Sequence, residues 1–167
     1  FDREGIYGFW DEAERYAFFC RAVLQMLPKL NWWPDIIHCN DWATGPIPLL
    51  LRDQYGSQSL YSRIATVFTI HNLQYQGNFP REVLGLLHLG DGYYHPDRLE
   101  FYGQVSYMKA GLLYADMIST VSRTYAREIQ RADQGHGMDG VLRMRAFDLM
   151  GIVNGINYHE FNPQTDP

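Results

Sequence analysis

The stretch that decides the fold of this chain is Val67-Phe68-Thr69-Ile70-His71-Asn72. Its first four residues are apolar or β-branched, which is typical of a strand buried on both faces of a parallel sheet. An imidazole and a carboxamide follow at the carboxyl end of the predicted strand, where open α/β sheets bind their ligands. These six residues alone allow two interpretations: a ligand site, or a polar pair that completes a strand-to-loop turn.

Short apolar runs and helical patterns alternate along the rest of the chain, which indicates parallel βαβ units and an α/β fold. We expect four strands, at residues 35–39, 64–70, 117–121 and 149–153. We expect helices at 11–27, 44–54, 103–114, 123–131 and 139–146, with Pro28 ending the first. Residues 72–102 are predicted to be a long loop with short helical pieces near 80–88 and 97–101.

Four strands are few for such a sheet, and a half-sheet would leave an apolar edge open. We therefore expect further strands on the N-terminal side of this one, and we interpret the chain as a piece of a longer protein. Beyond Tyr158 the sequence becomes polar and contains Pro163, which is typical of a linker.

Composition excludes several classes of function. The 167 residues are 46% hydrophobic, enough for one domain with a sizeable core, and the net charge is −5. There is no long basic run and no apolar stretch of membrane-spanning length, so we expect neither nucleic acid nor a membrane as partner. The six histidines lack metal-ligand spacing, so no metal is expected. Cys20 and Cys39 are predicted to be buried thiols.

Polar groups follow all four predicted strands, and in a parallel sheet they would meet at one edge. They are Asn40-Asp41-Trp42, His71-Asn72, Ser122 and Asn154-Gly155. Such a set suits a sugar, because carboxylates and carboxamides bind hydroxyl groups while an aromatic face packs on the ring. The alternatives are a helix-capping Asp41 with a core Trp42, and an N-cap role for Ser122. Three glutamates are assigned to solvated helix faces (Glu12, Glu14 and Glu128), and Lys109 is left unassigned.

Several longer motifs resemble one family. Residues 35–44 (DIIHCNDWAT), 68–77 (FTIHNLQYQG) and 151–156 (GIVNGI) resemble segments of bacterial glycogen synthases and plant starch synthases. Shorter matches follow in family order between them, so the resemblance covers nearly the whole chain. Asn40 stands where the family usually has His, and Asn157 where it usually has Asp, which leaves local acceptor contacts open.

The resemblance implies the Rossmann-like half of a glycosyltransferase with two Rossmann domains, the GT-B type. Such enzymes transfer glucose from ADP-glucose to the non-reducing end of an α-1,4-glucan with retention, without metal or other cofactor. Residues 1–157 would be part of the N-terminal, acceptor-side domain, and 158–167 would begin the interdomain linker. The donor-binding domain would be absent, so this piece alone is expected to be inactive. The implied location is the bacterial cytoplasm, or the plastid stroma for a plant protein.

The resemblance also implies roles for six residues. His71 would be catalytic, in contact with the transferred glucose near the reacting centre. Asp41, Trp42, Asn72 and Asn154 would line the glucose or acceptor pocket, and Tyr7, in the segment 2–7, would lie on the acceptor side. Two other functions stay open: a non-catalytic carbohydrate-binding module, and a related glucosyltransferase similar to sucrose synthase.

Overall fold

The computed structural model describes residues 3–158 and 160–165, so Asp2 of the segment 2–7 and part of the expected linker lie outside the described residues. A parallel sheet at its centre has the strand order β1-β2-β6-β7. The strands are β1 (Ile36–Asn40), β2 (Ala65–Ile70), β6 (Met117–Thr120) and β7 (Leu149–Gly151). The prediction of an α/β fold with four parallel strands is confirmed.

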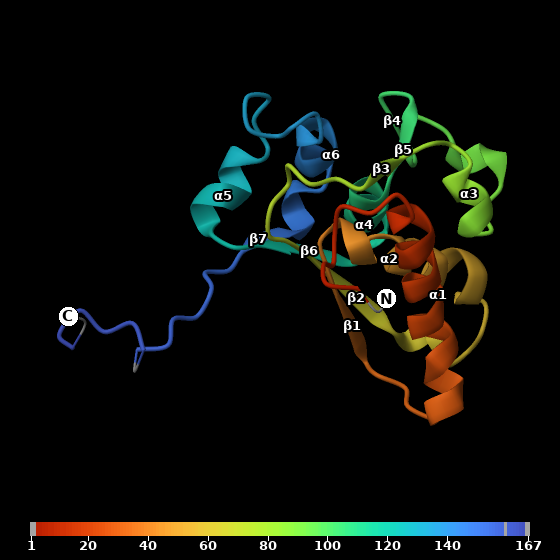
Figure 1. Cartoon of the computed structure of the whole chain (residues 1–167), viewed down its shortest axis with the longest axis horizontal. Coiled ribbons are helices and arrows are strands. Elements are labelled where there is room, and N and C mark those ends of the chain that lie inside the picture. Colours follow the sequence, from red (N-terminus) through yellow and green to blue (C-terminus); the bar gives the residue numbers. More distant parts are fainter. Residues whose placement is uncertain (1–2, 159, 166–167) are drawn as a thin grey trace.

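The described ranges contain six α-helices, which Figure 1 shows together with the sheet. They are α1 (Glu12–Leu30), α2 (Pro46–Leu50), α3 (Val83–Leu86), α4 (Tyr107–Tyr114), α5 (Arg123–Glu128) and α6 (Asp139–Met144). Single turns of 3₁₀-helix lie at Trp42–Thr44, Tyr61–Arg63, Asp91–Tyr93 and Ala146–Asp148. A π-helical turn, Leu51–Tyr55, extends α2.

Helix α1 continues through Pro28, so the prediction that this proline ends the helix was wrong. A proline lacks the N–H that would bond to the carbonyl four residues earlier. Here the hydroxyl of Tyr61 donates to the orphaned carbonyl of Leu24 at 2.8 Å. The helix ends instead at Asn31, which has a left-handed conformation with φ of 47°.

The segment after β2 contains a small antiparallel sheet that the sequence patterns did not indicate. Its order is β3-β5-β4, formed by β3 (Asn78–Phe79), β4 (Glu100–Phe101) and β5 (Gln104–Ser106). The predicted helical piece at 97–101 was therefore wrong, and the helix expected from residue 103 begins only at Tyr107. Lys109 secures this segment, since its ammonium donates to the carbonyls of Pro96 and Glu100.

One face of the parallel sheet forms the core. Cys39, Phe68 and Ile118 are fully buried there beneath α1, α2 and α4, which lie on one side of the sheet in Figure 1. Gly111 of α4 allows this packing, because a Cβ there would lie 2.4 Å from the Phe68 ring. Both cysteines are buried, as predicted, and burial raises the pKa of the Cys39 thiol to about 12.

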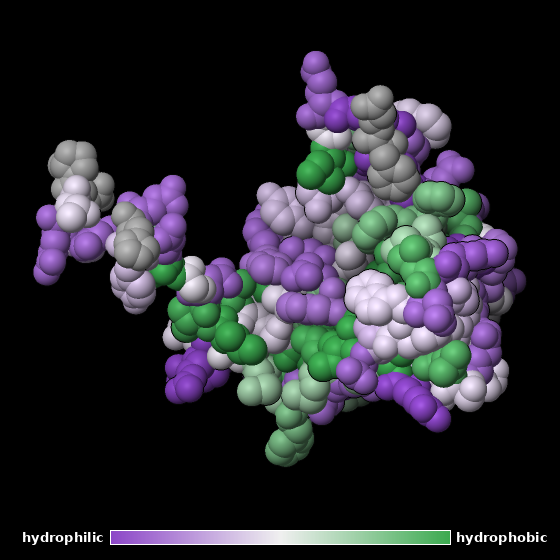
Figure 2. Space-filling view, turned by 90° about the horizontal axis from the view of Figure 1, so that it is seen from below, coloured by the Kyte–Doolittle hydropathy of each residue, from purple (hydrophilic) through white to green (hydrophobic). Residues whose placement is uncertain are grey.

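The other face of the sheet is partly exposed in the described part of the chain. Ile36 is 56% exposed, and Met117 and Met150 are exposed as well. Viewed from below, the molecule shows hydrophobic patches between polar ones on its surface (Figure 2). Within β2, Phe68, Thr69 and Ile70 are buried and Val67 is half-buried, so this run is largely covered on both faces, as predicted.

Candidate active site

The polar residues that follow β1 and β2 meet at the carboxyl edge of the sheet, as the sequence predicts. A cavity of about 520 Å³, here called the aromatic cavity, lies at this edge. Its lining residues come from the N-terminal segment, α1 and the loops after β1 and β2: Tyr7, Gly8, Glu12, Asp41, Trp42, Asn72 and Tyr75. Four of the six predicted site residues therefore share one cavity.

The remaining two, His71 and Asn154, line a neighbouring hollow of about 190 Å³, here called the histidine hollow. Side chains from all four parallel strands or the loops after them contribute to it, including Asn40, Thr69 and Ser119. The two cavities adjoin, because Asp41 and Asn72 of the aromatic cavity are chain neighbours of Asn40 and His71. The six predicted residues thus lie along one edge of the sheet.

Asp41 lines the aromatic cavity, bonds to His71 of the histidine hollow and has a strained backbone. Its φ of 55° and ψ of −179° belong to a region that is essentially reserved for glycine. Its carboxylate Oδ1 accepts a hydrogen bond from the backbone N–H of His71 at 2.8 Å. The backbone amide of Asp41 donates to the carbonyl of Thr69 at 2.9 Å, which fixes the loop after β1 against β2. Asp41 therefore occupies the N-cap position of the turn Trp42–Thr44, but its side chain makes no capping hydrogen bond.

The imidazole of His71 is exposed and has a polar partner. Its Nε2 lies 3.0 Å from Oδ1 of Asn40, the last residue of β1. Because an amide oxygen only accepts hydrogen bonds, this contact requires the proton on Nε2. His71 is thus held at its backbone by Asp41 and at its ring by Asn40.

Trp42 forms the wall of the aromatic cavity from within the core. It is 7% exposed, and its ring packs edge-on against Tyr16 with centroids 4.9 Å apart. Gly77 crosses its opposite side with φ of +56°, where a Cβ would lie 2.3 Å from the indole. Most of the Trp42 ring is therefore buried, in agreement with the alternative of a core tryptophan, and Trp42 also lines the cavity.

Two other aromatic rings are accessible in the aromatic cavity. Tyr7 is 57% exposed, and its ring centroid lies 5.6 Å from that of Trp42, while Tyr75 is 63% exposed. The sequence patterns missed the position of Tyr75, although it lies in the quoted 68–77 motif. They also assigned Glu12 to a solvated face, whereas its carboxylate lines the cavity and accepts hydrogen bonds from the N–H groups of Gly8 and Phe9.

A row of polar side chains crosses three strands beside the histidine hollow. Nε2 of His38 lies 2.6 Å from Oγ1 of Thr69, which lies 2.6 Å from Oγ of Ser119. The sequence patterns gave no indication of this row, because the register of three parallel strands creates it. Ser122, by contrast, is the N-cap of α5 and accepts from the amide of Tyr125 at 2.9 Å, in agreement with its N-cap interpretation.

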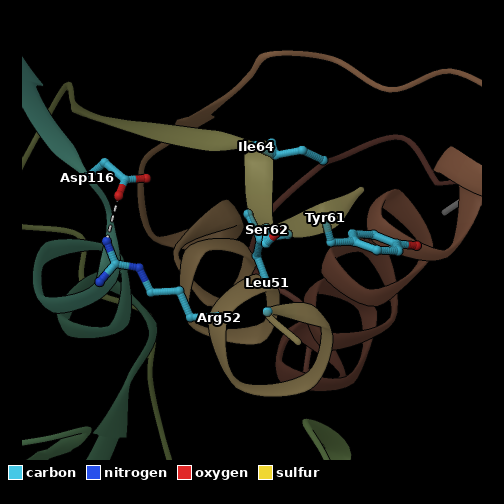
Figure 3. Close-up of a pocket in the computed structure, with 7 residues that line it drawn as sticks. Leu51, Arg52, Tyr61, Ser62, Ile64 and Asp116 are labelled. Atoms are coloured by element: carbon cyan, nitrogen blue, oxygen red, sulfur yellow. Dashed lines mark hydrogen bonds and ion pairs between the residues drawn. The ribbon is translucent and has the colours of Figure 1, made fainter. Parts of the chain in front are cut away.

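A further cavity, of about 320 Å³, lies at the amino edge of the sheet (Figure 3). Its charged side chains, Arg52 and Asp116, face each other and form an ion pair at 2.7 Å. The other carboxylate oxygen of Asp116 accepts hydrogen bonds from the amide and hydroxyl of Thr66 at 2.7 and 2.8 Å. These groups hold β2, β6 and the π-helical turn together.

A family model described as the starch synthase catalytic domain matches residues 1–144. The chain belongs to this family. The glycogen synthase of Desulforudis audaxviator is 67% identical over 165 residues, which cover 99% of this chain and 33% of that protein. The glycogen synthase of Moorella thermoacetica is 59% identical over 166 residues, with 99% and 34% covered.

A solved structure of the family agrees with the fold. The catalytic domain of starch synthase IV from Arabidopsis thaliana, bound to ADP and acarbose, superposes with a TM-score of 0.88 at 35% identity. The match covers 99% of this chain and 34% of that one, and it places the fold in the GT-B class. The chain therefore spans about a third of the length of the curated relatives named above.

Two further properties concern the described residues alone. Within residues 3–158 and 160–165, no helix is both long enough and apolar enough to cross a membrane. Within the same ranges, no three side chains of His, Cys, Asp or Glu gather in a way that could hold a metal ion. The carboxyl edge carries hydrogen-bonding groups, the carboxylates of Asp41 and Glu12, and exposed aromatic rings.

Proposed function

We propose that this chain forms the acceptor-side part of a retaining glucosyltransferase, a glycogen or starch synthase. The enzyme would transfer glucose from ADP-glucose to the non-reducing end of an α-1,4-glucan. The observation that carries the proposal is the arrangement of Tyr7, Asp41 and His71 along one sheet edge, in a chain 67% identical to a glycogen synthase. The bound ADP and acarbose of the Arabidopsis enzyme, a nucleotide and a glucan-like inhibitor, support the two substrate classes.

The geometry suits glucosyl transfer. An oxocarbenium-like transition state is stabilised by fixed dipoles around the sugar more than by a strong base. His71 is the catalytic residue in this proposal, because it is exposed and its ring is oriented by Asn40. The carboxylate of Asp41 and the amides of Asn72 and Asn154 would bind sugar hydroxyls. The ring of Tyr7, supported by Trp42, would pack on an apolar sugar face.

We also propose a domain organisation. Residues 1–157 would be part of an acceptor-side domain, and 158–167 would begin a linker to a donor-binding domain elsewhere in the polypeptide. The exposed face of the sheet supports this, because parallel sheets are normally covered on both faces. So does the length of the relatives, two thirds of which lies outside the match. By the same relationship, we propose a cytoplasmic location in a bacterium.

A segment exchange tests the proposed function. Residues 1–165 of this chain replace the matching third of the Desulforudis audaxviator glycogen synthase, and glucose incorporation from ADP-glucose into glycogen is measured. We expect turnover within about tenfold of the parent enzyme, because the exchanged surfaces are similar. A folded chimera without transferase activity would contradict the proposal.

The carbohydrate-binding module is the second candidate, and the separate chain distinguishes it from the first. Isothermal titration of residues 1–167 with maltooligosaccharides and with ADP-glucose measures binding by this part alone. We expect weak or undetectable binding, because in the proposed two-domain enzyme this part would supply one of the two walls of the substrate cleft. Tight glucan binding by the separate chain, together with an inactive chimera, would favour the module.

A further inference from the structure

The ring of His71 is held by a neutral side chain from a different strand. Asn40 ends β1, and His71 follows β2, so the parallel register brings the two together across the carboxyl edge of the sheet. The contact joins Oδ1 of Asn40 to Nε2 of His71 at 3.0 Å. A second contact, from the N–H of His71 to Oδ1 of Asp41 at 2.8 Å, fixes the backbone from which the ring extends.

We infer that Asn40 is a positioning residue, which orients the His71 imidazole and selects the neutral tautomer with its proton on Nε2. This inference rests on the proposed function, in which His71 contacts the transferred glucose. The tautomer leaves the lone pair of Nδ1 as the acceptor that the ring presents to a sugar hydroxyl. Asn40 itself would not need to touch the substrate.

The choice of an amide, rather than a carboxylate, has a chemical consequence. A carboxylate at this position would stabilise the charged imidazolium, whose two nitrogens are both donors. An amide oxygen orients the ring without that charge, so His71 keeps an acceptor nitrogen. A partner that fixes the tautomer and orientation of a functional histidine through its second nitrogen is a recurring arrangement in protein sites.

The titratable groups around His71 come from three elements. Asp41, after β1, bonds to the backbone amide of His71 rather than to its ring. His38, in β1, lines the same hollow, and its Nε2 contacts Thr69. Glu12, in α1, lines the adjoining aromatic cavity and accepts from backbone amides. Each of these groups has its own partner, and the ring contact of His71 is with the neutral Asn40.

The test compares two variants at Asn40 in the full-length chimera. Asn40→Ala removes the ring contact, and we expect kcat to fall about tenfold to a hundredfold with KM changed less than about threefold. Asn40→Asp restores an acceptor of the same shape, so part of kcat returns. Its charge favours the imidazolium, so the acid limb of the kcat profile moves to higher pH. Gln58→Ala removes an exposed amide shortly before the turn Tyr61–Arg63 and is the control that keeps parental kcat.

The outcomes separate this inference from the proposed function. Parental kcat in Asn40→Ala, or an unmoved acid limb in Asn40→Asp, would overturn the positioning role while leaving the transferase intact. If the parent chimera is inactive, the proposed function fails, but the positioning of the His71 ring by Asn40 can still be tested. Nitrogen-15 spectra of histidine-labelled chimera should then show the Nε2–H tautomer of His71, and its charged form should persist to higher pH in Asn40→Asp. If His71 titrates identically in the parent chimera and in Asn40→Asp, the positioning role of Asn40 is refuted.

Discussion

The two edges of the parallel sheet both carry cavities, but their polar groups are used differently. At the amino edge, Arg52 and Thr66 both donate to the carboxylate of Asp116, which ties three segments together. At the carboxyl edge, Asp41 and Asn40 hold His71 from two sides, and its exposed ring borders an open hollow. The amino edge is thus arranged for stability, whereas the carboxyl edge holds a strained residue and exposed polar groups. This combination is typical of a functional site.

The largest expected effect is on activity at the carboxyl edge. His71→Ala in the chimera should lower kcat about a hundredfold to a thousandfold, since losing a preorganised dipole at a transition state costs about 3–4 kcal/mol. Glucose incorporation from ADP-glucose at saturating substrate measures it. His95→Ala removes an exposed imidazole outside both cavities and should leave kcat unchanged. Near-parental turnover by His71→Ala would remove the catalytic role and, with it, the contrast between the edges.

The second prediction concerns the strain at Asp41. Asp41→Gly should be more stable than Asp41→Ala by about 1–2 kcal/mol, because glycine adopts φ of 55° with ψ of −179° without penalty. Both variants should lose activity, because neither has the carboxylate that anchors the amide of His71. Urea unfolding of the two variants measures the difference.

A matched pair of substitutions shows whether the order of these two stabilities is specific to Asp41. At Glu14, an exposed position inside α1, the order should invert, and Ala should be the more stable by about 1 kcal/mol. If Ala were the more stable residue at both positions, Asp41 would not be strained and the two edges would be energetically alike.

The smallest expected effect is on stability at the amino edge. Burial alone would raise the pKa of Asp116, but the hydrogen bonds from Thr66 and the charge of Arg52 outweigh it and lower the pKa below its ordinary value of 3.8. A lowered pKa stabilises the fold above the ordinary value, and this stabilisation is lost as the pH falls through the folded-state pKa. Because the Asp116 side chain is 43% exposed, solvent screens these interactions, and Asp116→Asn should destabilise the fold by less than about 1 kcal/mol near neutral pH. It should also flatten the loss of stability below about pH 4.

Thermal unfolding of Asp116→Asn between about pH 3 and pH 7 measures this effect, with transferase activity assayed in parallel. Asp133→Asn is the control, because Asp133 pairs with Arg131 two residues away and joins no separate elements. Activity should stay at the parental level in both variants. A loss of activity in Asp116→Asn without a loss of stability would give the amino edge a function of its own.

The comparison also shows which parts of the site could be predicted. The carboxyl-edge location of His71-Asn72 followed from one strand pattern, because parallel strands place their carboxyl ends together. The division into two cavities did not follow, since it depends on how the N-terminal segment and the loops after the strands pack. Glu12 was assigned to a solvated face because it lies off the apolar stripe of the predicted helix. The N-terminal segment approaches α1 there and changes that environment.

Errors in the fold prediction have similar physical causes. The sheet β3-β5-β4 is built from strands of two or three residues, which are too short for periodicity to reveal. Pro28 was expected to end a helix on local grounds, and a distant tyrosine hydroxyl satisfied the carbonyl that it orphaned. In both cases, contacts between residues far apart in sequence overruled a local preference.

The sequence by itself determined the α/β fold, its four parallel strands and the edge at which the functional groups gather. These depend on local patterns of apolar and polar residues, which can be recognised within short segments of the sequence. Only the tertiary structure decided that Trp42 supports a cavity from inside the core, that Asp41 is strained and that Asn40 holds the ring of His71. These depend on the register between strands and on the packing of loops, where residues distant in the chain set each other's geometry.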